Sequence, residues 1–180
     1  MIIASDIDDT ILNLIPCWIK AYNREFGDNL KPKDITDWNI AKFVLPEAKE
    51  EIFKYIEAED IFENAKPIEG ALKGINYFKS LGHRVIFISA NNPFNVKQKW
   101  LKKHKFIDDD KDFVQAYDKS LIMTDYLIDD KPDNIVNARG VGILYSQPHN
   151  QRFEWKYRAN NWEEVVQIIE GLEKDKYGNS

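Results

Sequence analysis

The sequence has one cysteine, three histidines and no apolar run long enough to cross a membrane. A single thiol, Cys17, excludes an internal disulfide and is typical of a reducing compartment. His83, His104 and His149 are scattered and there is no Cys/His cluster, which argues against zinc. The first residues carry no basic segment or small-residue cleavage site that would mark an export signal. We therefore expect a cytoplasmic protein with no membrane partner.

The charged residues also exclude a class of partners. There are 30 acidic and 25 basic residues, and no lysine- or arginine-rich block stands out. Such a balance argues against duplex nucleic acid as a partner. The only macromolecular partner we keep open is a second copy of the chain, in a homodimer. With 180 residues, 43% of them hydrophobic, the chain can bury one substantial core and carry a modest appendage.

Short apolar runs rich in isoleucine and valine recur with amphipathic segments between them, and this pattern favours an α/β fold. The expected strands cover residues 2–4, 85–89, 126–129 and 141–145. We predict a Rossmann-like parallel sheet flanked by helices. The residues expected on the buried faces of these helices are Leu72, Ile75, Phe78 and Leu81 before Gly82; Phe94, Trp100 and Leu101; and Trp162, Val165, Ile169 and Leu172. Residues 173–180 are expected to be a frayed polar tail.

Residues 15–66 interrupt this rhythm with helical patterns and no convincing strand. They are predicted to form an inserted helical cap, leaving 1–14 and 67–180 as the α/β core domain. The first cap helix is expected to bury Ile15, Trp18, Ile19, Tyr22 and Phe26, and a second, opened by Pro46, to bury Ile52, Phe53 and Ile56. A cap inserted after the first strand would lie over the carboxyl ends of the strands, where it could select a substrate and exclude water.

Four polar motifs are predicted to follow strands. They are Asp6-Ile-Asp-Asp-Thr10, Ser89-Ala-Asn91, Lys119, and Asp129-Asp-Lys-Pro-Asp133. The carboxyl ends of parallel strands share one edge of the sheet, so the four motifs can meet there. Any one motif alone has an ordinary explanation as a loop or helix cap. The ordered set indicates a phosphate-handling enzyme.

The chemistry expected at this edge depends on crowded carboxylates. Asp6, Asp8, Asp129 and Asp130, together with neighbouring acids, would place several negative charges in one cleft, and a hard cation relieves that repulsion. Oxygen ligands combined with a phosphate suit Mg²⁺. We expect Asp130, helped by Asp129, to hold the ion.

The motifs also suggest catalytic roles. Asp6 is placed to attack phosphorus and form an aspartyl phosphate. Asp8 would protonate the leaving alkoxide and later deprotonate water. Ser89, the backbone amides of Ala90 and Asn91, and Lys119 would bind the phosphoryl group.

This order of motifs resembles the haloacid dehalogenase (HAD) superfamily of phosphohydrolases, and the resemblance covers nearly the whole chain. Within it, several strings resemble the 5′(3′)-deoxyribonucleotidases: 66–70, Asp118-Lys-Ser120, 127–133 with Lys119 eleven residues before Asp130, 149–151, and Asn161-Trp162. The resemblance implies Asp6 as nucleophile and Asp8 as proton donor. It also implies Mg²⁺ held by Asp6, the backbone carbonyl of Asp8, and Asp130.

The resemblance further implies a deoxynucleotide substrate whose base is met by aromatic rings of the cap. The counterparts here are Trp38, Phe43 and Tyr55. Leu14 stands where family members place an aromatic residue, and Asp9 replaces a commoner glycine.

Alternatives remain at this stage. A HAD phosphatase acting on a sugar or other small organic phosphate would use the same core motifs. Dehalogenase chemistry has no need of the acid Asp8, and a mutase would have to return the phosphoryl group to its substrate. A receiver-like domain would carry its acidic phosphorylation site on the third strand. An idle nucleotide-binding module would be expected to have lost Asp6 or Asp8, and both are present.

Overall fold

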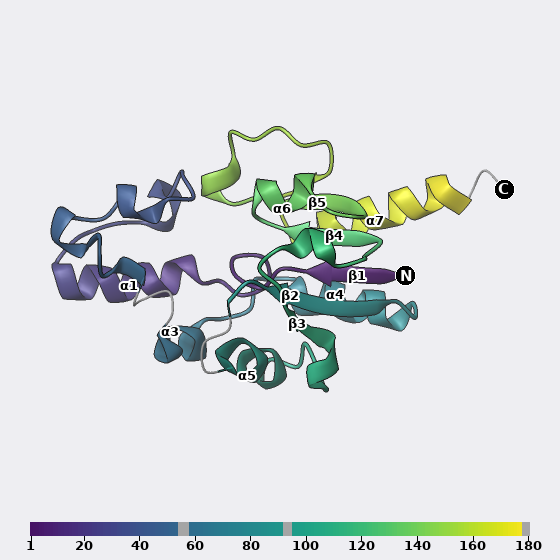
Figure 1. The fold of residues 1–180 in the computed structure, drawn as a ribbon, viewed down its shortest axis with the longest axis horizontal. Helices are drawn as coiled ribbons and strands as arrows, with labels where there is room; N and C mark the ends of the chain where they lie inside the picture. Colours follow the sequence, from purple (N-terminus) through teal and green to yellow (C-terminus); the bar gives the residue numbers. More distant parts are fainter. Residues whose placement is uncertain (54–57, 92–94, 178–180) are drawn as a thin grey trace.

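The fold is built on a six-stranded parallel β-sheet (Figure 1). The computed structural model describes residues 1–53, 58–91 and 95–177. Spatial order in the sheet is β3-β2-β1-β4-β5-β6. The strands are β1 (Ile2–Ser5), β2 (Arg84–Ser89), β3 (Phe113–Gln115), β4 (Tyr126–Asp129), β5 (Val141–Tyr145) and β6 (Arg158–Ala159). Every neighbouring pair runs parallel, so all carboxyl ends lie at one edge.

Helices connect the strands and cover the sheet. The crossovers include α4 (Ala71–Ser80), α5 (Val96–Lys103) and α6 (Pro132–Val136), and α7 (Trp162–Tyr177) follows β6. Side chains alternate between the two faces of each strand. Along β2, Val85 and Phe87 join a large hydrophobic cluster with residues of α4 and α7, whereas Ile86 and Ile88 join a smaller one with Ile135 of α6. The sheet is therefore buried on both faces, as continuous apolar runs predict.

The four predicted strands are confirmed to within one residue at each end. The edge strands β3 and β6 were not predicted, because three and two residues are too few to show a pattern. Short 3₁₀ turns η5 (Asp110–Asp112), η6 (Lys119–Leu121) and η7 (Pro148–Asn150) complete the core connections.

Two predictions about the helices are wrong. Leu81 is 52% exposed, because α4 ends at Ser80 and Leu81 lies past its last turn. The predicted polar tail is helical as far as residue 177, and the carboxylate of Glu173 accepts a hydrogen bond from the Tyr126 hydroxyl on β4. That contact ties the last turns of α7 to the sheet. Phe94 lies outside the described residues.

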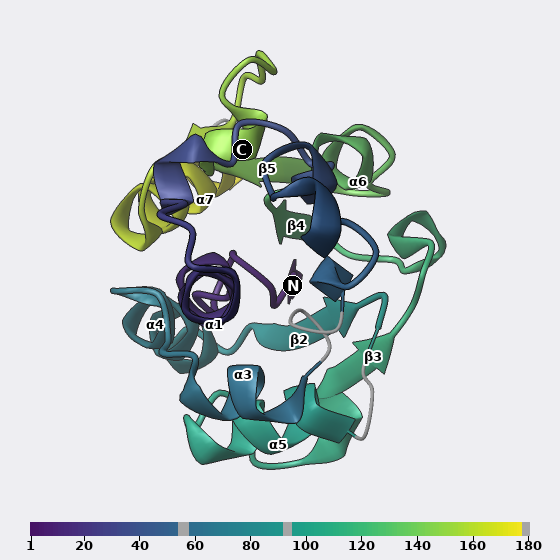
Figure 2. The ribbon, with the colours of Figure 1, turned by 90° about the vertical axis from the view of Figure 1, so that its left-hand side faces the viewer.

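The cap follows β1, as predicted, and lies beyond the carboxyl ends of the strands (Figures 1 and 2). Its elements are α1 (Ile15–Phe26), η1 (Pro32–Asp34), η2 (Ile40–Lys42), η3 (Pro46–Ala48) and α3 (Glu59–Asn64). On α1, Ile15, Trp18, Ile19 and Tyr22 are buried as expected, and Phe26 is half-buried. No strand occurs among the described residues between 15 and 66.

The second predicted cap helix differs from expectation. Pro46 opens the 3₁₀ turn η3, and Ile52 is buried. Phe53 is 56% exposed, contrary to prediction, because its ring faces the pocket described below. Ile56 lies outside the described residues. Further along, α3 packs against α5, and Trp100 Nε1 donates to the Ala65 carbonyl at 2.8 Å. The end of the cap is thereby attached to the core.

Candidate active site

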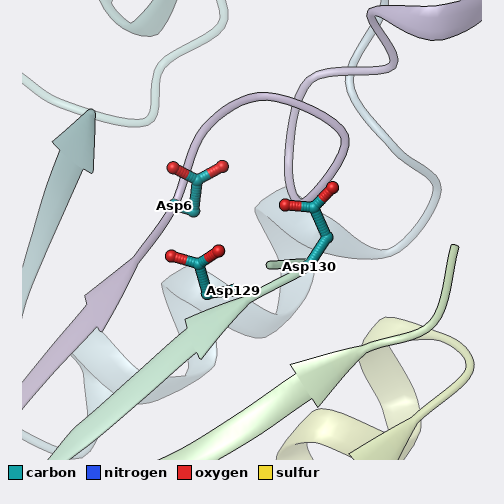
Figure 3. A group of neighbouring side chains, drawn as sticks. All are labelled: Asp6, Asp129 and Asp130. Atoms are coloured by element: carbon teal, nitrogen blue, oxygen red, sulfur yellow. The ribbon is translucent and has the colours of Figure 1, made fainter. Parts of the chain in front are cut away.

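Three carboxylates meet at the carboxyl edge of the two central strands (Figure 3). Asp6 follows β1, Asp129 ends β4 and Asp130 comes next. The strands are neighbours, and the Asp6 amide donates to the Ile128 carbonyl at 2.8 Å. One oxygen from each carboxylate lies within 4.8 Å of the others, and all three residues are buried. We refer to Asp6, Asp129 and Asp130 as the acidic triad.

Lys119 supplies a positive charge to this triad. Its Nζ donates to Asp6 Oδ1 and, at 2.7 Å, to Asp129 Oδ2, and its side chain is almost wholly buried. Burial alone would lower the pKa of Lys119, but Asp6 and Asp129 outweigh it and raise the pKa above its ordinary value. Lys119 therefore stays protonated and fixed beside Asp6.

The other two carboxylates of the triad differ in their surroundings. Both oxygens of Asp129 accept hydrogen bonds, from Lys119 and Asn134 Nδ2 (2.9 Å) and from the Lys131 amide (2.9 Å). Burial raises the pKa of Asp129 to about 6 against the opposing effect of Lys119. Burial and then the charges of Asp6 and Asp129 raise the pKa of Asp130 well above its usual range. Among the described residues, no side-chain hydrogen bond of good geometry reaches the Asp130 carboxylate, although His149 Nε2 lies 2.9 Å from its Oδ2.

Asp8 and Ser89 share a second lysine, Lys97 on α5. Lys97 Nζ donates to Asp8 Oδ2 and, at 2.6 Å, to Ser89 Oγ. Desolvation raises the pKa of Asp8, Lys97 opposes the rise, and the negative charge of Asp6 adds to it. About a third of the Asp8 side chain is exposed, at 32%, so it can reach a ligand in the pocket. Asp8 is thus an acid with a raised pKa and a defined partner.

A pocket of about 330 Å³ opens above these groups, between core and cap. Asp6, Asp8, Ser89, Lys119 and the other triad members line it, with Ala90 and Asn91 next to Ser89. The apolar residues that line it include Leu14 before α1 and Ile15, Trp18, Ile35 and Ile40 of the cap, and Asp37 of the cap lines it as well. A pocket lined by a cluster of charged groups and by several apolar side chains suits a ligand that has both an anionic group and an apolar part.

Of the aromatic residues expected to meet the base, the structure brings Trp38 to the pocket. Phe43 is half-buried against the hydrophobic core, and the residues that line the pocket do not include it. Tyr55 lies outside the described residues. Two further aromatic residues, Phe53 and Tyr117, line the pocket and are exposed.

Asp9 connects the loop that follows β1 to the first helix of the cap. Its backbone has a φ of 51°, a left-handed conformation that explains why glycine is common at this position. Its Oδ1 accepts hydrogen bonds from the amides of Leu14 (3.0 Å) and Ile15 (2.9 Å) at the start of α1. Burial, and then the charge of Asp130, raise the pKa of Asp9 well above its ordinary value.

Sequence reasoning missed two residues of the site, Lys97 and His149. Lys97 lies three and four residues before Trp100 and Leu101, on the buried stripe of α5, and a lysine on such a stripe was the available signal. His149 Nε2 lies 2.9 Å from Asp130 Oδ2, and both side chains are almost fully buried. The only signal for His149 in the sequence is its place in the string 149–151, which resembles the deoxyribonucleotidases.

The acidic triad has the donor set of a hard divalent cation. Its ligand atoms are carboxylate oxygens close together, and like charges raise the pKa of Asp130, a cost that a bound cation would remove. Oxygen ligands in a buried cluster suit Mg²⁺ better than Zn²⁺. The residues present therefore fit a Mg²⁺ site. The structure does not test whether the backbone carbonyl of Asp8 joins it, and that stays a prediction.

Solved structures share this architecture. A haloacid dehalogenase-like hydrolase from Streptococcus pneumoniae aligns with 93% of this chain and 97% of its own, with a TM-score of 0.66 and 13% identity. A predicted phosphatase from Clostridium acetobutylicum aligns with 95% of this chain and 98% of its own, with a TM-score of 0.65 and 14% identity. At such identities the likeness shows the fold alone, which is that of the HAD hydrolases.

The sequence places the chain more narrowly. Residues 1–175 match the family described as 5′ nucleotidase, deoxy (pyrimidine), cytosolic type C protein, and the chain belongs to this family of phosphomonoesterases. A 5′(3′)-deoxyribonucleotidase of Clostridium acetobutylicum is 31% identical over 171 residues, covering 93% of each chain. One from Bacillus subtilis is 29% identical over 167 residues, covering 91% of this chain and 95% of its own. Among the described residues, no helix has both the length and the apolar character to cross a membrane.

Proposed function

We propose that this protein is a Mg²⁺-dependent phosphatase that hydrolyses deoxyribonucleoside 5′- and 3′-monophosphates through an aspartyl phosphate on Asp6. The observation that carries the proposal is the pairing of Asp6 with Lys119 in a pocket that apolar side chains also line. Family membership and the names of the relatives support the deoxynucleotide as substrate. The cytosolic type in the family's description and the single thiol support a cytoplasmic location.

In the first step, a carboxylate oxygen of Asp6 attacks phosphorus while the bond from phosphorus to the nucleoside oxygen breaks. Asp8 donates a proton to the departing oxygen, and its raised pKa favours the protonated form that this step needs. Ser89, Lys119 and Lys97 bind the phosphoryl oxygens, with the backbone amides of residues 90 and 91.

In the second step, Asp8 takes a proton from water as the water oxygen attacks phosphorus. The bond between phosphorus and Asp6 breaks, which releases inorganic phosphate and restores the Asp6 carboxylate and the protonated Asp8 that the next cycle needs. Mg²⁺ bound by Asp6 and Asp130 would neutralise charge between the anionic nucleophile and the anionic substrate. Asp129, with both oxygens already hydrogen-bonded, acts mainly by fixing Lys119.

The apolar lining of the pocket is proposed to hold the nucleoside. Trp38 offers an aromatic face there, and Leu14, Ile35 and Ile40 supply the rest of the wall. Phe53 and Tyr117 lie at the same pocket and gain burial when a base enters.

The proposal is tested by phosphate release from a panel of nucleotides and sugar phosphates. We expect turnover of dUMP, dTMP or dGMP that requires Mg²⁺ and is lost in Asp6→Asn. If these three nucleotides are inert and a sugar phosphate is hydrolysed, the substrate assignment is wrong and the protein is a HAD phosphatase of another specificity.

A further inference from the structure

Trp38, which lies between η1 and η2 of the cap, contacts two residues of the core. The Trp38 ring meets the His149 ring edge-on, with centroids 5.0 Å apart and planes at 82°. Lys131 Nζ lies 5.2 Å from the centroid of the same indole. His149 and Lys131 belong to loops of the core, and η1 lies against η7. We refer to Trp38, His149 and Lys131 as the cap seam.

His149 connects this seam to the acidic triad. Its Nε2 lies 2.9 Å from Asp130 Oδ2, and each side chain is 4% exposed. Nε2 is buried without a hydrogen bond of good geometry, although the carboxylate oxygen is within reach. A carboxylate has two oxygens, so Asp130 can hold a cation with one while the other faces the imidazole. The orientation of the Asp130 carboxylate thus depends on where the His149 ring lies.

The turn η7, which carries His149, is hydrogen-bonded to the loop that follows β1 and to the loop that follows β4. Asn150 Nδ2 donates to the Asp130 carbonyl at 2.7 Å, and Asn150 Oδ1 accepts from Arg158 Nη1 at 2.9 Å. Gln147 Nε2 donates to the Asp9 carbonyl at 2.6 Å. Asn150 is 2% exposed, so these bonds are shielded from water. The backbone of η7 therefore cannot shift without moving the loops of the triad.

We propose that His149 is a positioning residue that orients Asp130 for cation binding and holds the cap against the core through Trp38, so that Mg²⁺ binding and this contact between cap and core are coupled. The inference rests on the proposed function, which places Mg²⁺ at the triad. Residues that orient a metal ligand typically change metal affinity by roughly 10- to 100-fold when removed. Coupling of this kind is reciprocal: a cap held on His149 strengthens Mg²⁺ binding, and bound Mg²⁺ holds the cap.

The first test is Mg²⁺ binding to the full chain, measured by calorimetry without substrate. We expect His149→Ala to weaken binding roughly 10- to 100-fold. His149→Gln, which keeps an N–H at a similar reach, should recover part of the loss, a rescue that a purely space-filling role would not produce. His83→Ala is the matched control: it removes another imidazole at the opposite edge of the sheet, before β2, and should bind as wild type does.

The second test concerns coupling to the cap. Trp38→Ala should also weaken Mg²⁺ binding, although Trp38 does not belong to the triad. In the double variant with His149→Ala, the two losses should fall short of their sum, because both act through one contact. Full additivity, or wild-type Mg²⁺ affinity in Trp38→Ala, would overturn the coupling.

These results separate the inference from the proposed function. If wild type binds Mg²⁺ and His149→Ala binds it equally well, the inference fails and the proposed function stands. If no nucleotide is hydrolysed while Mg²⁺ affinity follows the expected pattern, the substrate assignment fails and the role of His149 stands. If Mg²⁺ does not bind the wild-type chain, both are overturned.

Discussion

Replacing Asp130 by asparagine should stabilise the protein while removing its response to Mg²⁺. The ligand oxygens of the acidic triad lie within 4.8 Å of one another, and two unit charges at that distance repel by about 3.5 kcal/mol at an effective dielectric constant of 20. Lys119 offsets part of this repulsion. We therefore expect Asp130→Asn to gain about 1–3 kcal/mol near pH 8 in EDTA, or roughly 2–10 °C in Tm for a chain of this size.

The sign of the effect depends on pH in a defined way. Burial, with the charges of Asp6 and Asp129, raises the pKa of Asp130 well above its ordinary value, so the folded state binds the proton more tightly than the unfolded state does. Stability contributed by this group is then present at low pH and is lost as pH rises through the folded pKa. The advantage of Asp130→Asn over wild type should accordingly be large near pH 8 and vanish toward pH 4.

Thermal unfolding with and without Mg²⁺ measures both effects. Wild type should gain Tm on addition of Mg²⁺, because a ligand that binds only the folded state stabilises it, and Asp130→Asn should not. Asp129→Asn is an informative companion, since it leaves Asp130 intact but removes one of the two carboxylates that hold Lys119. An Asp130→Asn protein that is no more stable than wild type, and still gains Tm with Mg²⁺, would refute the electrostatic reasoning.

Three further substitutions separate the parts of the site. Lys97→Met should lower kcat/KM by roughly 10- to 100-fold, since hydrogen bonds to charged groups contribute about 1.5–3 kcal/mol. The same substitution should move the alkaline limb of the pH profile to higher pH, because Lys97 lowers the pKa of Asp8. Asp9→Gly should lower the free energy of unfolding by about 1–2 kcal/mol in urea titrations, since the amides of Leu14 and Ile15 lose their acceptor. Asp9→Asn keeps an oxygen acceptor and should be at least as stable as wild type. Trp38→Ala, assayed at saturating Mg²⁺, should raise KM by up to about 10-fold with little change in kcat, as expected for a ring that contacts the nucleoside and not the phosphate.

The catalytic edge could be predicted because strand ends are a local feature of the sequence. An apolar run followed by Asp6, or by Asp129 and Asp130, gives both the element and the place where it stops, and parallel pairing then brings the ends together. Lys97 was beyond this reasoning, because a lysine on a helix is ordinary until the tertiary structure places it beside Asp8. His149 was missed for the same reason: its partner comes from a different loop.

The cap was predictable in position but not in detail. A long segment without strand patterns marked the insertion, and the amphipathic stripe of α1 gave its first helix. Its later part consists largely of 3₁₀ turns, whose burial depends on the core beneath them, and periodicity carries little information there. Phe53 shows the consequence: it was assigned to a buried face and instead lines the pocket.

The central claim is that Asp6 becomes phosphorylated during turnover. Acid quenching of the enzyme during hydrolysis of a dUMP labelled in its phosphate, followed by peptide mapping, tests this most directly. The account predicts label on the peptide that contains Asp6, discharged on a longer incubation before the quench, and none in Asp6→Asn. Steady turnover with no labelled protein in wild type, together with undiminished turnover in Asp6→Asn, would contradict it.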